Sequence, residues 1–433
     1  MQNLAQRDRA AIWHPFTQMK TAGDCIPIVR GEGARLYDAD GKEYIDAIAS
    51  WWMNLHGHAN AYIAKCLKAQ ADTLEHVIFA NFTHRPAIEL AERVLAKMPD
   101  SQTKFFFSDN GSTAVEVGLK MCFQYWFNIN QVRKKIVAFE GAYHGDTFGA
   151  MSVGGHSAFS KPFLPFLFDV EFIPIPTQDN REESLRQMKA ILEAEPIAGF
   201  IFEPLVQGSA GMRMYTAAVL EEMMQMCKAK GTLCIADEVM VGFGRTGNFF
   251  ATDALSTPPD IYCLSKGLTG GTMALGGTTC TEKIFKAFWS DDKLKAFFHG
   301  HSCTGNPLAC SVGLASMDLM EKESTWENIN RIIATHKAFQ ERIKNYPNVR
   351  NLRQTGVILA FEIHTTEGNS YFNSLRDTIW NFFLERGLLL RPLGNTVYIL
   401  PPYCITKEEL DRVYDGVVEL LERLNGQNNY RTL

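Results

Sequence analysis

The chain has 433 residues, too many for one ordinary hydrophobic core and suited to two domains or to one large domain with a smaller one. Hydrophobic residues make up 46% and charged residues 21%, a globular composition with ample material for a core. The formal net charge of −5, with no compensating basic stripe, argues against nucleic acid as the main partner.

The sequence also gives expectations about the compartment. The first residues, MQNLAQRDRAAIWHPF, lack an apolar core of the signal-peptide type, and no uninterrupted apolar run is long enough to span a bilayer. Ten cysteines are scattered without a Cys-x-x-Cys pair, and most lie in apolar segments, as Cys234 and Cys263 do. Such cysteines indicate buried, reduced thiols. We therefore expect a cytoplasmic protein without a membrane partner.

Short apolar runs and longer amphipathic stretches alternate through the first two thirds of the chain. Residues 29–37 and 43–47 are expected to form short strands around the turn Asp40–Gly41, packed as a separate small piece. The expected strands that follow are 104–108, 135–139, 170–175, 197–203, 232–237 and 260–264, and the expected helices are 112–127, 183–194 and 216–229. This alternation predicts an α/β fold with a mostly parallel sheet covered by helices.

The pattern changes after about Ser324. We expect helices at 325–346, 374–387 and 407–425, and strands at 356–363, 388–391 and 396–400. These elements indicate a compact α+β domain. The expected division is an N-terminal segment at 1–55, a large domain at 56–323 and a small C-terminal domain at 324–433.

Two residues at the ends of expected strands suggest a cofactor. Lys266 follows an apolar run and precedes glycines in IYCLSKGLTGGT, and Asp237 ends another apolar run before a glycine-rich loop. Ligands of parallel sheets bind beyond the carboxyl ends of the strands, where Ser108 and Glu203 are also expected. A lysine amine for covalent attachment and a carboxyl for a pyridinium nitrogen are what pyridoxal phosphate (PLP) most needs from a protein. A helix cap or a salt bridge is the commoner role for an aspartate such as Asp237.

Two loops after expected strands could complete such a site. In SDNGSTAVEVGLKM a helix begins near Ser112, and its first amides could bind a phosphate, with Gly111 allowing close approach and Ser112 adding a hydroxyl. An ordinary helix cap is the alternative. In EGAYHGDTFG, Tyr143 or His144 could stack on a flat ring, although a loop aromatic more often serves packing.

Histidine pairs raise the possibility of a metal. His299 and His301 lie in HGHSCTGNP, and His56 and His58 form a second pair. No carboxylate or thiolate lies at a spacing typical of a metal site beside either pair, so we expect no metal.

Arg391 lies between apolar runs in LLLRPLGNTVYILPPY, where it could bind a substrate carboxylate or form a structural salt bridge. Trp51 and Phe16 belong to an N-terminal aromatic group that could line an aliphatic substrate pocket or simply form core.

Several motifs resemble those of one enzyme family. Over nearly its whole length the chain resembles the class III (omega-amino acid type) PLP-dependent aminotransferases. The family-level motifs are ADEVMVGFGRTG, LSKGLTGG and TGNPLAC. Motifs of a narrower group are IWHPFTQM, SWWMNLHGH, GSTAVEVGLKM, YHGDTFGAMSVGG, QGSAGMRMY, LTGGTMALGGT and RPLGNTVYILPPY. The resemblance implies the PLP type I fold, with a large α/β domain and a smaller α+β domain built from both chain ends.

The resemblance also implies a role for each matching residue. Lys266 would carry PLP covalently and shuttle a proton, and Asp237 would hold the ring nitrogen protonated. Gly111 and Ser112 would bind the phosphate. Tyr143 would lie near the ring and contact the substrate.

Substrate recognition is implied for three further residues. Trp51 and Arg391 would hold the substrate, the arginine by its carboxylate. Phe16 belongs to the same substrate site but stands where the family often has tyrosine, so a hydroxyl assigned to substrate recognition is missing.

Gly300, His301 and Ser302 fall where the family takes phosphate and substrate contacts from a neighbouring subunit, so the resemblance implies a homodimer with shared sites. His301-Ser302 replaces a more usual Pro-Thr or His-Thr pair, although the serine keeps a hydroxyl.

The narrower motifs imply transamination of 8-amino-7-oxononanoate with S-adenosylmethionine as amino donor, a step of biotin biosynthesis. Three alternatives stay open. They are lysine as the donor, a class III aminotransferase acting on 4-aminobutyrate, ornithine or a diamine, and a PLP-binding regulator without turnover.

Overall fold

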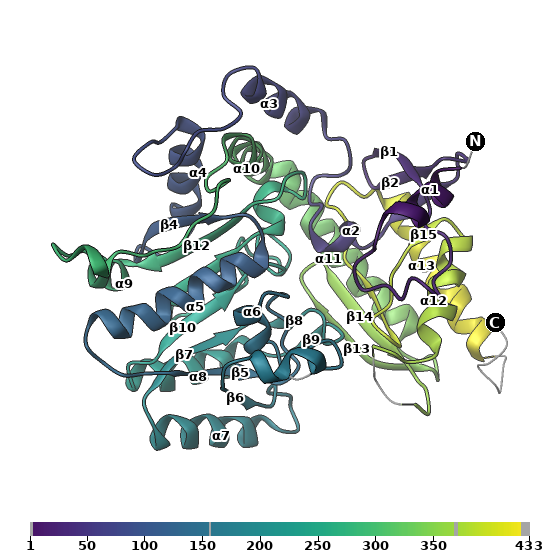
Figure 1. Cartoon of the computed structure of the whole chain (residues 1–433). Helices are drawn as coiled ribbons and strands as arrows, with labels where there is room; N and C mark the ends of the chain where they lie inside the picture. The colour runs from purple at the N-terminus through teal and green to yellow at the C-terminus, as the bar shows by residue number, and fades with distance from the viewer. Residues whose placement is uncertain (1–2, 156, 368–370, 426–433) are drawn as a thin grey trace.

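The computed structural model describes residues 3–155, 157–367 and 371–425. Its main feature is a seven-stranded sheet in the order β4-β12-β11-β10-β7-β5-β6 (Figure 1). The strands are, in that order, Gln102–Ser108, Gly276–Thr281, Ile261–Leu264, Leu233–Asp237, Ile197–Phe202, Lys135–Phe139 and Val170–Ile173. β12 runs antiparallel to β4 and β11, and the remaining pairs are parallel. The predicted mostly parallel sheet is confirmed.

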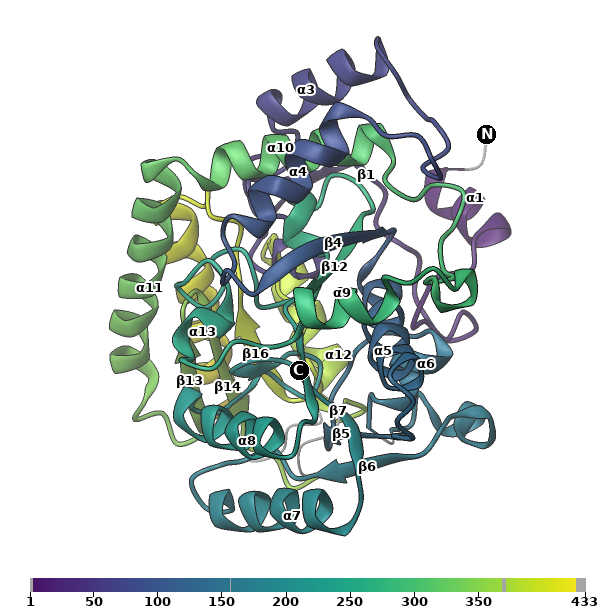
Figure 2. The same cartoon turned by 90° about the vertical axis from the view of Figure 1, so that its left-hand side faces the viewer.

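Helices cover both faces of this sheet because alternate residues of its strands point to opposite sides. Ile235 packs in the cluster formed with α5 (Gly111–Asn128), whereas its neighbours Cys234 and Ala236 pack in the cluster on the other face. That other face is covered by α4 (Arg85–Leu95), α7 (Arg181–Ala194) and α8 (Ala217–Ala229), as the second view shows (Figure 2). Both faces are apolar, which explains the continuous apolar runs of the central strands.

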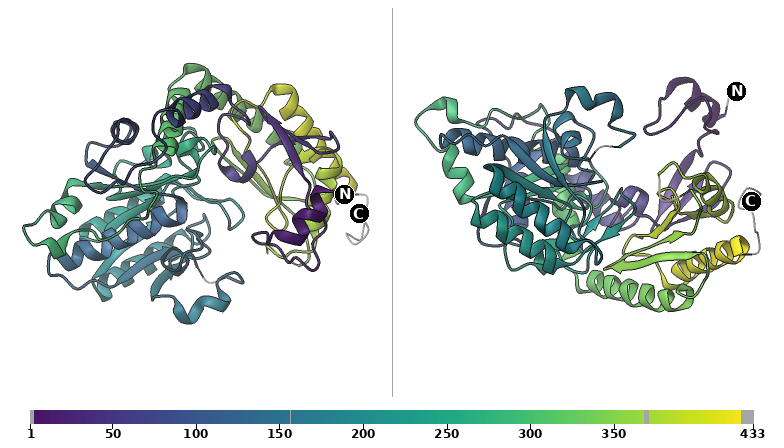
Figure 3. Two further views of the ribbon diagram at one scale, coloured as in Figure 1. Left: turned by 45° about the horizontal axis from the view of Figure 1, so that its top comes forward. Right: turned by 90° about the horizontal axis from the view of Figure 1, so that it is seen from below.

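The two chain ends build a second part beside the large sheet. The three-stranded sheet β13-β14-β16 comprises Val349–Thr355, Ile358–Ile363 and Thr396–Ile399. The four-stranded sheet β1-β2-β3-β15 comprises Ile28–Glu32, Arg35–Asp38, Glu43–Asp46 and Leu388–Leu389. In Figure 3 the N-terminal and C-terminal elements lie together on one side of the molecule.

The remaining elements connect and cover these sheets. The longer helices are α1 (Leu4–Ala11), α3 (Ala61–Ala71), α10 (Pro307–Met320), α11 (Glu323–Ile343), α12 (Leu375–Glu385) and α13 (Lys407–Asn425). The short helices are α2 (Ala49–Trp52), α6 (Phe148–Ser152) and α9 (Glu282–Phe288), with 3-10 turns at Lys161–Phe166, Ala251–Ala254, Lys266–Thr269 and Lys293–Lys295. A small hairpin joins β8 (Val206–Gln207) to β9 (Arg213–Met214). No helix within the described residues is long and apolar enough to cross a membrane.

Two expectations for the N-terminal strands are wrong. The single strand expected at 29–37 is two strands, because the chain turns at Gly33, whose φ of 56° suits glycine. These strands are also not a separate piece, since Leu388 of β15 pairs in parallel with Ile45 of β3. This pairing agrees with the smaller domain built from both chain ends that the resemblance implies. The sequence around each strand does not reveal a parallel pairing with a strand so far away along the chain. The division of the chain at residues 55 and 323 stays a prediction.

A buried histidine makes the second part sensitive to acid. His336 of α11 contacts the Tyr414 hydroxyl of α13 through Nδ1 at 2.6 Å and the Val357 carbonyl through Nε2 at 3.1 Å. Burial lowers the pKa of His336 from 6.5 to about 4. Between these values the unfolded chain binds a proton that the folded chain excludes, so stability falls as the pH drops through this window.

We therefore predict that His336 alone lowers the free energy of unfolding by about 1.6 kcal/mol between pH 6.5 and 5, at 1.36 kcal/mol per pKa unit. Urea unfolding of the wild type and of His336→Gln at several pH values measures this difference. The variant should be less stable at pH 7.5 but should lose less stability on acidification. Equal pH slopes in the two proteins would contradict the assignment.

Candidate active site at the carboxyl edge of the sheet

The candidate residues gather where parallel strands end. Asp237 is the last residue of β10 and pairs in register with Cys263 of β11, and Lys266 follows three residues later. Glu203 follows β7 directly, and Tyr143 lies in the loop after β5. Because neighbouring parallel strands end at the same edge, four segments distant in sequence meet there.

Asp237 is held by a buried histidine. Its Oδ2 atom lies 2.7 Å from Nδ1 of His144, and its Oδ1 atom accepts from the amide of Val239 at 3.0 Å. Asp237 and His144 are 4% and 3% exposed. The sequence offered Tyr143 or His144 as a stacking residue, and the ring of His144 is the one that contacts the Asp237 carboxyl. The Nε2 atom of His144 is buried without a partner among the described residues.

Glu203 links two loops at the floor of the site. It accepts from the amide of Tyr143 at 3.1 Å and from the amide of Gly208 at 2.8 Å. Burial raises the pKa of Glu203 to about 7, while His144 lowers this pKa and Asp237 raises it. Glu203 therefore fixes the Tyr143 loop and adds a second acidic group near Asp237.

Lys266 occupies an unusual backbone conformation above an indole ring. Its φ of 41° lies in the left-handed region, which is costly for a residue with a Cβ and is often found at functional sites. Its Nζ atom lies 4.8 Å from the centroid of the buried Trp52 ring. Burial lowers the pKa of Lys266 to about 8, although Asp237 and Glu203 act to raise it.

Arg245 is a buried cation that the sequence did not single out. Its guanidinium donates to the carbonyls of Pro401 at 2.9 Å and Trp52 at 3.2 Å, and its charge further lowers the pKa of Lys266. These bonds join the glycine-rich loop to the N-terminal and C-terminal segments. Arg245 therefore fixes the backbone of Trp52, the ring that lies against the Lys266 amine.

The N-terminus of α5 faces the same edge. A Cβ atom on Gly111 would lie 2.6 Å from Cγ1 of Val239, two residues beyond Asp237, so a larger residue at position 111 would have to displace that side chain. The side chain of Asn110 accepts from the amide of Thr113. The amides of Gly111 and Ser112 precede the first intrahelical bonds and carry the positive end of the helix dipole. They are suitable donors for a phosphate.

The hydroxyl of Ser112 is engaged elsewhere. It lies 2.8 Å from the hydroxyl of Thr147 and accepts from the Thr147 amide at 3.0 Å. Because Thr147 donates its own proton to Glu116 at 2.5 Å, Ser112 donates to Thr147. The amide of Ser112 is thus the donor left available for an anion in this arrangement, and the additional contact expected from its hydroxyl stays a prediction.

Tyr143 lies at the mouth of the site, 36% exposed, and its hydroxyl donates to Oδ2 of Asp146 at 2.9 Å. Burial of the ring and the neighbouring carboxyl groups raise the pKa of Tyr143, so the phenol keeps its proton at neutral pH. The ring is therefore a neutral, partly exposed surface beside Glu203 and Asp237.

An aromatic wall carries the candidate substrate arginine. The guanidinium carbon of Arg391 lies 4.5 Å from the centroid of the Trp51 ring, and Nη2 lies 3.5 Å from the hydroxyl of Tyr371. Phe16 contacts Trp51 at 5.7 Å and Phe159 at 5.8 Å between ring centroids. No carboxylate within the described ranges forms an ion pair with Arg391, so its charge is available to an anion.

Gly300, His301 and Ser302 lie on the segment between α9 and α10. His301 donates its amide to the hydroxyl of Thr304 at 3.0 Å, and its Nε2 atom is buried without a partner in the described part of the chain. No hydrogen bond or ring contact between described residues joins these three to Lys266 or Asp237. A contribution to a partner's site stays a prediction.

The groups at the carboxyl edge of the sheet match those that PLP needs from a protein. Lys266 supplies an amine for an aldehyde, Asp237 an acceptor for a pyridinium nitrogen, and the start of α5 two amides for a phosphate. The orphaned Nε2 of buried His144 shows that this polar cluster is incomplete within the chain itself.

Comparison with known proteins gives one consistent result. Residues 18–421 match the model of the family Aminotransferase class-III. The chain is 46% identical to adenosylmethionine-8-amino-7-oxononanoate aminotransferase of Synechococcus elongatus, over 95% of this chain and 99% of that protein. It is 40% identical to the Helicobacter pylori protein of the same name, over 98% of each chain.

Two solved structures resemble this fold over nearly the whole chain. The crystal structure of the Methanocaldococcus jannaschii aminotransferase of that name covers 97% of this chain and 98% of its own, with 35% identity and a TM-score of 0.92. An omega transaminase from Pseudomonas jessenii, in complex with PMP, covers 99% of this chain and 100% of its own, with 26% identity and a TM-score of 0.93.

The lowered pKa of Lys266 is open to a direct test. In cofactor-free protein, the rate of reductive methylation at this amine should rise with a midpoint near pH 8. The surface lysines of the same digest should follow the ordinary lysine profile, near pH 10.4. Glu203→Gln should move the Lys266 midpoint to lower pH, because the Glu203 charge raises this pKa. Peptide mass spectrometry measures each site, and a Lys266 midpoint matching the surface lysines would contradict the electrostatics.

Proposed function

The chain belongs to the class-III aminotransferase family, and we propose that it transfers an amino group from S-adenosylmethionine to 8-amino-7-oxononanoate, giving 7,8-diaminononanoate for biotin biosynthesis. The substrates are those named by relatives at 40% and 46% identity over nearly the whole chain. The observation that carries the proposal is the buried cluster of Lys266, Asp237 and His144 at the carboxyl edge of the parallel sheet.

We propose pyridoxal 5'-phosphate as the cofactor. When bound, it supplies an electrophilic carbon for amines and a ring that accepts an electron pair. Lys266 would attach it, Asp237 would hold a proton on its ring nitrogen, and the amides of Gly111 and Ser112 would bind its phosphate. His144 would orient Asp237 through the 2.7 Å contact, and Tyr143 would lie beside the ring.

The chain's own proton carrier is the Nζ atom of Lys266. With a pKa of about 8, about a quarter of this amine is neutral at pH 7.5, against about one part in a thousand for a lysine with a pKa of 10.5. The neutral amine can remove a proton from the substrate carbon that bears nitrogen and can return it in the opposite half-reaction. Trp52 and Arg245 keep the amine in place for both transfers.

Arg391 is proposed to bind the carboxylate of the substrates, and Trp51 to support the guanidinium from one side. Phe16 extends this wall with an apolar ring where the family often has a tyrosine hydroxyl. An aliphatic chain carrying a terminal carboxylate matches an aromatic wall with one cation.

We further propose that the protein is a cytoplasmic homodimer whose partner subunit supplies Gly300, His301 and Ser302 to each site. All ten cysteines are free, which is compatible with a reducing compartment. The unpartnered Nε2 atom of His301 is available to a group from outside the chain.

Product analysis tests the reaction. Purified protein loaded with PLP is incubated with 8-amino-7-oxononanoate and either S-adenosylmethionine or lysine, and the diamine is identified by mass. We expect product with S-adenosylmethionine. Lys266→Ala should lower turnover at least about 10³-fold, because it removes the proton carrier and the attachment point. The surface variant Lys189→Ala should remain active. Product with lysine alone would reassign the donor, and absence of product with both would overturn the function.

Arg391→Ala tests whether this residue acts in substrate binding, measured by KM, rather than in the chemical step, measured by kcat. Loss of a charge-assisted hydrogen bond of about 1.5–3 kcal/mol corresponds to a KM for 8-amino-7-oxononanoate raised about 10–150-fold. The effect on kcat should be smaller, since Arg391 contacts neither Lys266 nor Asp237, and Arg391→Lys should restore part of the affinity. Arg386→Ala, which removes a surface partner of Glu419, is the matched control. An unchanged KM in Arg391→Ala would exclude carboxylate binding by this residue.

A further inference from the structure

The N-terminal helix α1 lacks a hydrophobic anchor. None of its eight residues, all within the described range 3–155, is buried, and Trp13 just after it is 87% exposed. Polar contacts hold the segment instead. Arg9 donates to Asp24 at 3.2 Å and to the carbonyl of Ala22 at 3.3 Å. Exposed contacts of this kind contribute little stability, so the segment needs another constraint to keep one position.

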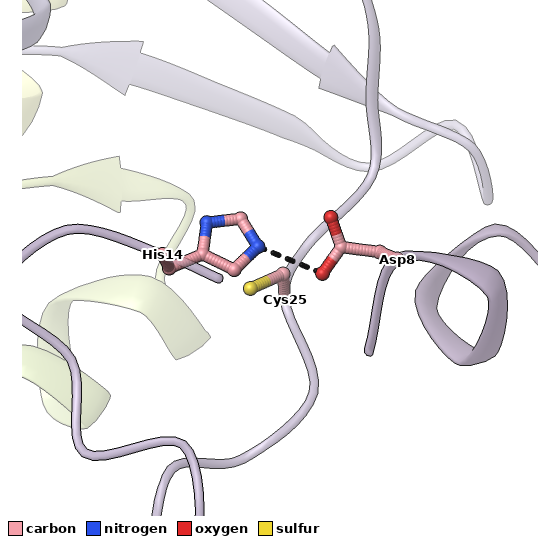
Figure 4. Close-up of side chains that lie close together, drawn as sticks. All are labelled: Asp8, His14 and Cys25. Atoms are coloured by element: carbon pink, nitrogen blue, oxygen red, sulfur yellow. Dashed lines mark hydrogen bonds and ion pairs between the residues drawn. The ribbon is translucent and has the colours of Figure 1, made fainter. Parts of the chain in front are cut away.

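Three side chains converge inside this segment. Asp8 of α1, His14 of the following loop and Cys25 before β1 point toward one another (Figure 4), and one ligand atom of each lies within 4.8 Å of the other two. Nε2 of His14 lies 2.8 Å from Oδ2 of Asp8. The side chains of Asp8 and His14 are only 22% and 28% exposed. The spacings in sequence, six and eleven residues, match no common metal motif and gave no signal.

A carboxylate, an imidazole and a thiolate form a typical donor set for Zn²⁺. Their charges also suit the ion, because the carboxylate and thiolate together balance the two positive charges while the imidazole stays neutral. Bonds of about 2.0–2.3 Å place ligands of a tetrahedral zinc roughly 3.3–3.7 Å apart. The Asp8–His14 pair is already closer than this, and the trio requires an adjustment of about 1 Å, which rotation of exposed Cys25 can supply.

We propose that Asp8, His14 and Cys25 form a Zn²⁺ site in which water completes the tetrahedron. On binding, the S–H bond of Cys25 is replaced by an S–Zn bond and the proton passes to the solvent, with no change of oxidation state. The ion joins α1, the loop after it and the strand lead-in, and none of residues 3–27 in these segments is buried. Its binding energy adds to the few apolar contacts that this segment makes, chiefly those of Phe16 with Trp51 and Phe159.

The site has a consequence for the catalytic pocket. Phe16, two residues beyond His14, lies against Trp51, and Trp51 in turn lies against Arg391. Fixing His14 therefore fixes one end of this aromatic wall. The site is separate from the proposed PLP residues, so its existence does not depend on the proposed function.

Metal binding to the PLP-loaded protein, free of any affinity tag, tests the proposal. Equilibrium dialysis against Zn²⁺ with elemental analysis should find one tightly bound ion per chain. Cys25→Ser and His14→Gln should each weaken this binding at least about tenfold. Cys303→Ser, which removes another exposed thiol, is the matched control and should bind as the wild type does. Amide hydrogen exchange should slow within residues 4–27 when Zn²⁺ is added.

Visible absorption of bound Co²⁺ shows whether a thiolate is among the ligands. A tetrahedral Co²⁺ site with thiolate should give intense visible bands in the wild type and in Cys303→Ser, but not in Cys25→Ser. The proposal is overturned if no ion binds tightly, if Cys25→Ser and His14→Gln retain wild-type affinity, or if the bands persist without Cys25. If the rate of amide hydrogen exchange in residues 4–27 did not change on addition of Zn²⁺, the anchoring role would be excluded.

Discussion

The structure depends on one electrostatic constraint, an amine buried beside acidic groups at the edge of a parallel sheet. Burial lowers the pKa of Lys266 to about 8, and Asp237 and Glu203 limit this fall. Burying such groups costs free energy unless they find partners. His144 supplies one for Asp237, and the amides of Tyr143 and Gly208 supply two for Glu203. The cluster thus keeps an amine of lowered pKa beside two buried acidic groups.

The fold makes this arrangement rigid. Parallel pairing in register sets Asp237 beside Cys263, so the position of Lys266 follows from the sheet rather than from a flexible loop. Arg245 then couples the glycine-rich loop to Trp52 and to Pro401, and thereby brings both chain ends to the amine. Arg391 lies on the second part, against the Trp51 ring, and is the residue proposed there to bind the substrate carboxylate.

Much of this was readable in the sequence. Apolar runs ending in Asp237 and near Lys266 predicted the sheet edge, and β5 and α13 were predicted to the residue. β12 is not predicted because its GGTTCT begins with two glycines, which are depleted in strands. Gly277 is needed there because a Cβ would lie 2.1 Å from the Phe105 ring. The Ser112–Thr147 bond, the His144–Asp237 pair and the trio around Cys25 arise only from tertiary contact. Periodicity and spacing carry no information about them.

Covalent attachment at Lys266 tests the central claim most directly. The holoprotein as isolated is reduced with borohydride, digested and mapped by mass spectrometry. We expect a phosphopyridoxyl group on the peptide containing Lys266 and on no other lysine, and no stable label in Lys266→Ala. A label on a different lysine, or a protein that releases all its cofactor after reduction, would contradict the role assigned to this buried amine.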